Sequence, residues 1–211
     1  MSKVTAVTAD LADDVLLRRM IAGDEEAFTA LYRRRQSAVY RFALHMSGNA
    51  AVAEDVVQEA FMTLIRDARR FDPQRGTLGG FLIGIARNHL RRRWEQDRRV
   101  VPLLEESDSA GFTSSGNGNG HHNGNGIRAD DRFATLDAIA SVRGAIATLP
   151  ENYREVVILC ELQEMSYEEA AAALDCPIGT VRSRLHRARA LLVEKLRSTH
   201  EQPARHAVAG E

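Results

Sequence analysis

The chain has 211 residues, of which 44% are hydrophobic and 27% are charged, and its formal net charge is −1. This length and composition predict one or two packed domains and exclude a chain that is disordered throughout. The near-neutral charge excludes binding of nucleic acid by general positive charge. Any DNA binding must come from local basic clusters, offset by acidic surface elsewhere.

Cysteine usage and hydropathy indicate the compartment. Cys160 and Cys176 do not form a Cys-x-x-Cys pair, and the sequence has neither a signal peptide nor a long apolar run. We therefore expect a cytoplasmic protein without membrane insertion, in which both cysteines are small buried residues.

Helical periodicity starts after about residue 11 and continues to about residue 99. Asp24 is placed to cap a long helix, and Asn49 is placed to cap the next one. In that next helix we expect a buried stripe of Val52, Val56, Ala60, Phe61, Leu64 and Ile65. Asp55, Gln58 and Glu59 fall on another face, where they can offer charge-assisted hydrogen bonds to a basic partner.

The run from Phe71 to Gly76 breaks the pattern and predicts a loop, after which Thr77 can cap a further helix. Glycines 79, 80 and 84 each cost that helix about 1 kcal/mol relative to alanine, which indicates close packing against a neighbour or a bend. Its arginine-rich end beside Trp94 suggests a surface that grips single-stranded nucleic acid. The alternative for this end is a solvated helix terminus, favoured by the helix dipole.

Residues 100–130 lose all periodicity and contain the low-complexity run GNGNGHHNGNG at 116–126. Such a composition builds no core, so we expect a flexible linker that lets two helical domains move independently. The adjacent histidines 121 and 122 have no cysteine nearby and are interpreted as part of the spacer, not as metal ligands.

Helical periodicity returns over residues 131–198, and residues 199–211 are expected to be a disordered tail. Within this second domain Ser166 and Glu169 form a capping box, and Pro177 separates two short amphipathic helices. This pattern is typical of a helix-turn-helix, although an ordinary amphipathic helix with a solvated basic face is the alternative. The DNA-reading candidates on the second helix are Thr180, Arg182, Ser183, Arg184, His186 and Arg187.

Three stretches together resemble bacterial RNA polymerase sigma factors of the extracytoplasmic-function (ECF) type: AEDVVQEAF at 53–61, the run from FDP at 71–73 to IARN at 85–88, and LPENYREV at 149–156 leading into IGTVRSRL at 178–185. The resemblance covers about residues 12–198. It implies an all-α fold, with sigma region 2 at 12–99 and the region 4 helix-turn-helix at 131–198. Phe81 stands where the family usually has tryptophan, and Arg92 where an acidic residue often follows, so we expect the contacts of that helix to differ in detail.

The resemblance implies a transcription initiation factor, not an enzyme, that needs no metal or cofactor. It assigns the first domain to the clamp helices of core RNA polymerase, through Asp55, Gln58 and Glu59, and to the −10 promoter element. The second domain is assigned to the polymerase flap and to the −35 element. Further implied partners are promoter DNA and an anti-sigma factor, with the protein a monomer when free or bound 1:1. The residues implied at the −10 element are Phe71, Asp72, Arg75, Gly76, Thr77, Arg87, Asn88 and Arg91.

A stand-alone transcriptional regulator and a metal-dependent enzyme are the two alternative functions. A stand-alone regulator could use the same helix-turn-helix as an operator-binding dimer, but it leaves residues 12–99 without a role. A di-metal carboxylate enzyme could be built on Glu54, Asp55 and Glu59, but the chain has no Glu-x-x-His or His-Glu-x-x-His spacing to complete the ligand set.

Overall fold

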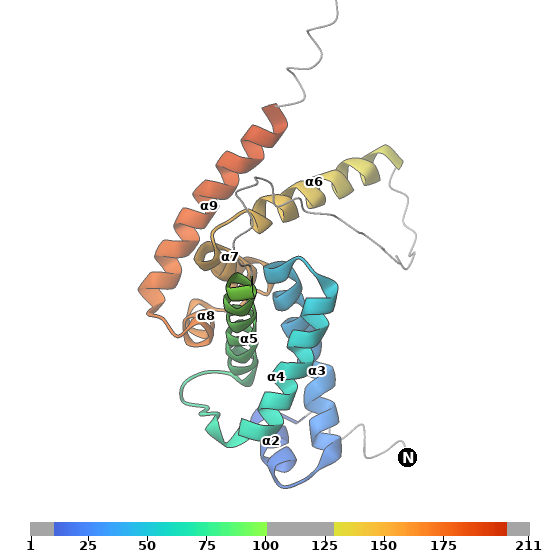
Figure 1. Ribbon diagram of the computed structural model, residues 1–211, viewed down its shortest axis with the longest axis vertical. Helices are drawn as coiled ribbons and strands as arrows, with labels where there is room; N and C mark the ends of the chain where they lie inside the picture. The colour runs from blue at the N-terminus through green and yellow to red at the C-terminus, as the bar shows by residue number, and fades with distance from the viewer. Residues whose placement is uncertain (1–10, 101–128, 202–211) are drawn as a thin grey trace, which may run out of the picture.

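The computed structural model describes residues 11–100 and 129–201, and every regular element in these two ranges is a helix (Figure 1). The predicted all-α fold is confirmed. Most of the predicted linker, residues 101–128, and most of the predicted tail, residues 202–211, lie outside the described residues.

Within residues 11–100, the first domain contains one short helix, three long helices and one short 3₁₀ turn. Asp24 accepts hydrogen bonds from the backbone amides of Glu26 and Ala27, and the Asn49 side chain accepts one from the amide of Val52. Both predicted caps are therefore confirmed. The elements are α2 (Asp13–Ile21), α3 (Glu25–Ser47), α4 (Ala50–Asp67), the 3₁₀ turn η1 (Ala68–Arg70) and α5 (Leu78–Val100).

One apolar stripe on each of these helices faces a shared core, where Leu31, Phe42, Leu64 and Leu82 are fully buried. Ile65, which periodicity placed in the buried stripe, is instead 52% exposed. It lies four residues after Phe61, at the edge of the stripe, where it lines a groove of α3 and α4. The stripe on α4 is therefore narrower than the sequence predicted.

The second domain begins with α6 (Ala129–Ala147), and α7 (Glu151–Val157) follows directly after Pro150. A π-helical turn, η2 (Ile158–Leu162), leads to the helix-turn-helix of α8 (Tyr167–Leu174) and α9 (Ile178–Glu201). The predicted capping box of Ser166 and Glu169 is present at the start of α8, with hydrogen bonds of 3.0 and 3.1 Å. Both cysteines are half-buried, not buried as expected: Cys160 lies within η2 and Cys176 in the turn between α8 and α9.

The two domains pack directly against each other. Helix α5 lies between α4 of its own domain and α8 of the second domain (Figure 1). Arg154 donates from Nη1 to the carbonyl of Met46 at 2.9 Å, and Gln163 donates from Nε2 to the carbonyl of Ala38 at 3.1 Å. The linker composition predicted independent movement, whereas the structure joins both domains through one continuous core.

Candidate functional site

The acidic face predicted on α4 is exposed. Asp55, Gln58 and Glu59 are one helical turn apart and point to solvent. Asp55 also lies 3.1 Å from Nη1 of Arg93 on α5, in an ion pair in which both side chains are largely exposed. Such a pair contributes little to stability, so Asp55 stays available to a partner.

An apolar groove lies beside this acidic face and was not found from the sequence. The groove of α3 and α4, called the α4 groove below, has a volume of about 600 Å³ and includes Gln58 in its lining. The rings of Tyr32 and Phe61 pack edge to face at 4.8 Å along its floor. Met62 and Ile65 are more than half exposed at its side. Met62 and Ile65 follow Gln58 by four and seven residues and so lie on the same face of the helix. This spacing could have predicted the groove.

The loop between η1 and α5 has an ordered backbone. Asp72 accepts a hydrogen bond from the amide of Gln74 at 2.9 Å, and its carbonyl accepts one from the amide of Arg75 at 3.0 Å. Thr77 caps α5 as predicted, through a 3.2 Å bond from the amide of Gly80 to its Oγ1. The Phe71 ring packs against Phe81 of α5 at a centroid distance of 5.5 Å, so Phe81 supports the loop.

Every residue expected at the −10 element lines one cleft of about 610 Å³. The loop and the exposed side of α5 form one wall, and α8 supplies the other through Ala172, Ala173 and Asp175. We call this space the α5–α8 cleft. The structure thus brings together residues from 71–77 and 87–91, which are separated by about two and a half turns of helix.

Arg87, one of those residues, is turned toward the second domain. It donates from Nε to Oε1 of Glu155, which is fully buried, and only 13% of the Arg87 side chain is exposed. Burial raises the pKa of Glu155, while the hydrogen bond and charge of Arg87 oppose that rise. The second oxygen, Oε2, has no hydrogen-bond partner among the described residues. Arg91 follows one turn later, with Nε at 3.4 Å from Oε1 of Glu151.

The glycines of α5 explain how α8 approaches so closely. A Cβ on Gly84 would lie 3.3 Å from the carbonyl oxygen of Ala173, and one on Gly80 would lie 3.7 Å from that of Glu169. A larger residue would force the two helices apart. The close packing expected from these glycines is confirmed.

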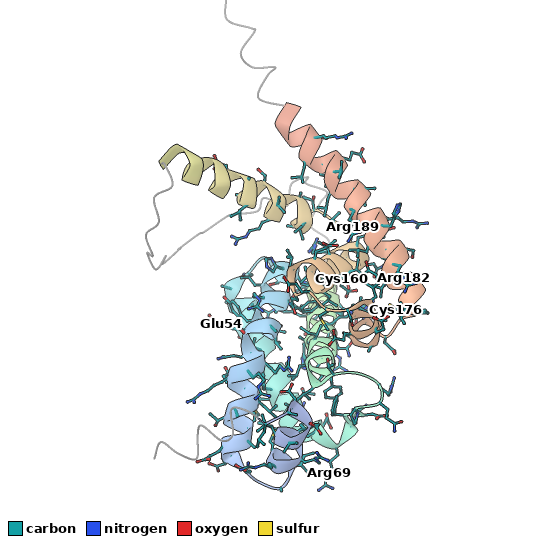
Figure 2. The ribbon with its side chains drawn as sticks, turned by 180° about the vertical axis from the view of Figure 1, so that it is seen from behind. Glu54, Arg69, Cys160, Cys176, Arg182 and Arg189 are labelled. Atoms are coloured by element: carbon teal, nitrogen blue, oxygen red, sulfur yellow. The ribbon has the colours of Figure 1, made fainter. Side chains whose placement is uncertain are left out.

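The exposed face of α9 carries the residues expected to read duplex DNA. Arg182, Ser183, His186 and Arg187 are exposed, and Thr180 and Arg184 are half-buried. Val181, Leu185 and Ala188 are buried beneath them, as their spacing predicted. The Arg182 guanidinium lies 5.9 Å from the ring centre of Tyr167, the first residue of α8, within the range of a cation–π contact. Figure 2 shows Arg182 and Arg189 along α9, on the opposite side of the view from Glu54.

Two remaining expectations concern Trp94 and metal binding. Trp94 packs half-buried against the hydrophobic core, so only part of its side chain is exposed beside the arginines at the end of α5. Within residues 11–100 and 129–201, no group of three or more His, Cys, Asp or Glu side chains is placed to hold a metal ion. Glu54, Asp55 and Glu59 thus gather no further ligand in that part of the chain.

Comparison with known proteins gives the family. The family model for sigma-70 region 2 matches residues 31–100, and that for sigma-70 region 4 matches residues 139–192. The ECF RNA polymerase sigma-E factor of Escherichia coli K12 is 33% identical over 194 residues, which cover 90% of this chain and 97% of that protein. The chain belongs to the ECF RNA polymerase sigma factors.

Other relatives of this ECF sigma factor agree. The RNA polymerase sigma-H factor of Pseudomonas aeruginosa is 33% identical over 181 residues, covering 84% of this chain and 90% of that protein. The ECF sigma factor SigE of Mycolicibacterium smegmatis is 33% identical over 192 residues, covering 88% and 68%. The protein is therefore a transcription initiation factor built from sigma regions 2 and 4.

Solved structures of similar proteins share the fold of this ECF sigma factor. CnrH, in complex with the cytosolic domain of CnrY, gives a TM-score of 0.63 at 25% identity, covering 89% of this chain and 99% of that one. The sigma factor RpoE of Bartonella quintana, in complex with the anti-sigma factor NepR, gives 0.56 at 27% identity, covering 81% and 96%. No helix in the described ranges is long and apolar enough to cross a membrane.

Proposed function

We propose that this sigma factor binds core RNA polymerase through the α4 groove and its acidic rim, and divides promoter recognition between two surfaces. The α5–α8 cleft holds the melted −10 element, and the exposed face of α9 reads the −35 duplex. The observation that carries the proposal is that every residue expected at the −10 element lines one cleft, while the duplex-reading residues lie apart from it on α9.

The α4 groove suits a helical partner with apolar and basic side chains. Met62 and Ile65 offer exposed apolar surface that is costly to leave in water, and Asp55 and Glu59 lie beside it on the same helix. An apolar patch with a charged rim is typical of protein interfaces. We assign this surface to the clamp helices of the polymerase.

The α5–α8 cleft suits an extruded base and its flanking strand. The loop backbone is fixed by the Asp72 turn and by the Thr77 cap, so the cleft has a defined shape before DNA arrives. Asn88 and Arg91 are exposed and form a polar track that leads away from the loop along α5, and Arg87 beside them lines the same cleft while it pairs with Glu155. A shaped pocket followed by a basic track is what capture of a flipped base from a separated strand requires.

Helix α9 suits the major groove of duplex DNA. Its buried stripe rests on the second domain, and its exposed face presents long bidentate donors such as Arg182 and Arg187. Arginine pairs with guanine, and the shorter polar side chains can grip phosphate. The second domain would also contact the polymerase flap.

The remaining partners follow from the family. We place the protein in the cytoplasm, where RNA polymerase works, as a monomer that binds its partners 1:1 and catalyses no reaction of its own. The solved complex of an RpoE sigma factor with the anti-sigma factor NepR supports an anti-sigma factor as a regulator of this protein too.

The polymerase-binding surface is tested by charge reversal. The double variant Asp55→Arg with Glu59→Arg should weaken binding to purified core polymerase in a pull-down while the circular dichroism spectrum stays unchanged. The matched control reverses Glu95 and Asp97, exposed carboxylates on α5 of the same domain, and should bind core as the unaltered chain does. An unchanged affinity of the Asp55 and Glu59 variant for core polymerase would contradict this assignment.

A further inference from the structure

Asp13, the first residue of α2, holds two neighbouring arginines of α3. Arg34 donates from Nη1 to Oδ1 of Asp13 at 2.7 Å, and Arg35 donates from Nε to Oδ2 at 2.6 Å. Arg34 also donates to the carbonyl of Leu11 at 2.8 Å. Only 13% of the Asp13 side chain is exposed, so these charge-assisted hydrogen bonds lie in a partly desolvated site and are stronger than exposed ion pairs. Both guanidinium groups are therefore fixed in position.

The guanidinium of Arg35 lies against the first turn of α5. A Cβ on Gly79 would lie 3.2 Å from Nη1 of Arg35 and 3.6 Å from its Cζ. Gly79 thus leaves room for this side chain, whereas Gly84 leaves room for the backbone of α8. The first glycine of α5 therefore has a neighbour of its own, which comes from α3 of the same domain.

Arg35 also lies behind the loop at 71–77, which leads into this turn. Arg35 and Asp13 line a pocket of about 370 Å³, and Phe71, Gly76 and Thr77 line the same pocket. These three loop residues also line the α5–α8 cleft. The loop therefore lies between two spaces, with the cleft on one side and the pair of Asp13 and Arg35 on the other.

Support from this side matters because the hydrogen bonds within the loop are local and exposed. Asp72 accepts from the amides of Gln74 and Arg75, and all three residues are exposed. Exposed hydrogen bonds with few buried contacts around them open easily. A fixed side chain behind the loop limits the shapes that the loop adopts before DNA arrives, and so lowers the entropic cost of holding a base.

We propose that Arg35, held by Asp13, is a positioning residue for strand capture, which fixes the loop at 71–77 and the first turn of α5 from the side opposite the cleft. This inference rests on the proposed function, since it takes this loop to be the one that captures the extruded base. The effect of Arg35 on DNA passes through the loop.

Hydrogen exchange of the free full-length chain tests the support directly. Arg35→Ala removes the guanidinium and should make the backbone amides of segment 74–80 exchange about five-fold faster or more, since a contact between packed groups is lost. The matched control is Arg33→Ala, which removes an exposed arginine two residues earlier on α3 and should leave this exchange unchanged. Equal exchange by the two variants would overturn the proposal.

A second variant tests whether the contact between positions 35 and 79 is what matters. Gly79→Leu places a side chain where the Arg35 guanidinium lies and should speed the same exchange, although leucine favours a helix more than glycine does. In the double variant with Arg35→Ala, the leucine can enter the space that the guanidinium leaves. The double variant should therefore exchange more slowly than either single variant, and Gly79→Leu with Arg33→Ala should show no such recovery. Additive effects at positions 35 and 79 would overturn the proposal.

Promoter opening tests whether this support serves strand capture. The promoter is selected from a pool of genomic fragments by transcription with core polymerase and the unaltered chain, and a fluorescent base analogue in its −10 element reports unpairing. Arg35→Ala should lower the equilibrium constant for opening about five-fold or more, while binding to core polymerase and to the −35 duplex stays unchanged. The double variant with Gly79→Leu should recover opening. Normal opening by Arg35→Ala would overturn the positioning role.

The proposed function is judged separately in this design. It fails if the unaltered chain directs transcription from none of the fragments. In that case the exchange rates of the single and double variants still decide whether Arg35 holds the loop.

Discussion

His45 and His89 are half-buried histidines of the first domain, and burial is the main cause that lowers the pKa of both below the ordinary 6.5. Arg143 and Arg41 lower the pKa of His45 further by their charge. For His89, the charge of Glu59 acts in the opposite direction. His89 also shares a 3.2 Å hydrogen bond with the hydroxyl of Thr63, which holds its ring at the junction of α4 and α5.

These two shifts make stability depend on pH. Below about pH 6.5 both histidines bind a proton more readily in the unfolded chain than in the folded one. The free energy of unfolding should therefore fall as the pH drops through this value. The raised pKa of Glu155 gives a slope of the opposite sign, since its folded form holds a proton longer. The histidine contribution is therefore measured as a difference between two chains. Urea unfolding at several pH values should show a smaller loss on acidification for His45→Gln with His89→Gln than for the unaltered chain. Equal losses would contradict the burial of the two rings.

Single residues also show which features the sequence could predict. Asp24, Asn49, Thr77 and Ser166 were predicted as caps because a cap depends only on residues a few positions away. The pairing of Arg87 with Glu155 joins two residues 68 positions apart. Periodicity says where a side chain points on its own helix, but not which other helix will lie against it.

Helix α5 has one feature that the sequence predicted, a close neighbour, and one that it did not, the domain from which this neighbour comes. Its glycines predicted a close neighbour, and α8 is that neighbour. The composition of residues 100–130 gave no sign that the neighbour would come from the second domain, because a linker of this kind permits contact and separation equally. The α4 groove was missed for a related reason, since Ile65 was counted with the core before the position of α3 was known.

Enlarging Gly84 should push α8 away from α5. A Cβ there would lie 3.3 Å from the carbonyl oxygen of Ala173. The leucine side chain in Gly84→Leu therefore has no room while α8 lies against α5. Small-angle X-ray scattering of the free variant should show a larger radius of gyration than that of the unaltered chain.

Gly144→Leu is the matched control for this change. Gly144 lies within α6, and a Cβ there meets nothing within 4 Å. Both substitutions remove a helical glycine and so favour their own helix by about 1 kcal/mol, but only the one at Gly84 has a steric consequence. If both variants have the same radius of gyration as the unaltered chain, the packing of α8 against α5 does not depend on Gly84.

In the whole molecule, polymerase binding, strand capture and duplex reading are assigned to separate surfaces on α4, in the α5–α8 cleft and on α9. The sequence predicted these surfaces as separate sets of residues. It could not predict that α8, from the domain that reads the duplex, would form one wall of the strand-capturing cleft.

The division of labour between the two domains is tested most directly by permanganate footprinting of polymerase–promoter complexes, which reports unpaired thymines. Asp72→Ala with Arg75→Ala alters the loop at the α5–α8 cleft, and Arg182→Ala with Arg187→Ala alters α9. Complexes with the loop variant should keep upstream duplex binding but lose reactive thymines at the −10 element. Complexes with the α9 variant should lose about 1–3 kcal/mol of binding for each base-reading arginine and relax the upstream preference, while those that form open normally. Normal opening by the loop variant, together with full upstream preference in the α9 variant, would contradict the assignment of the two promoter elements to these two surfaces.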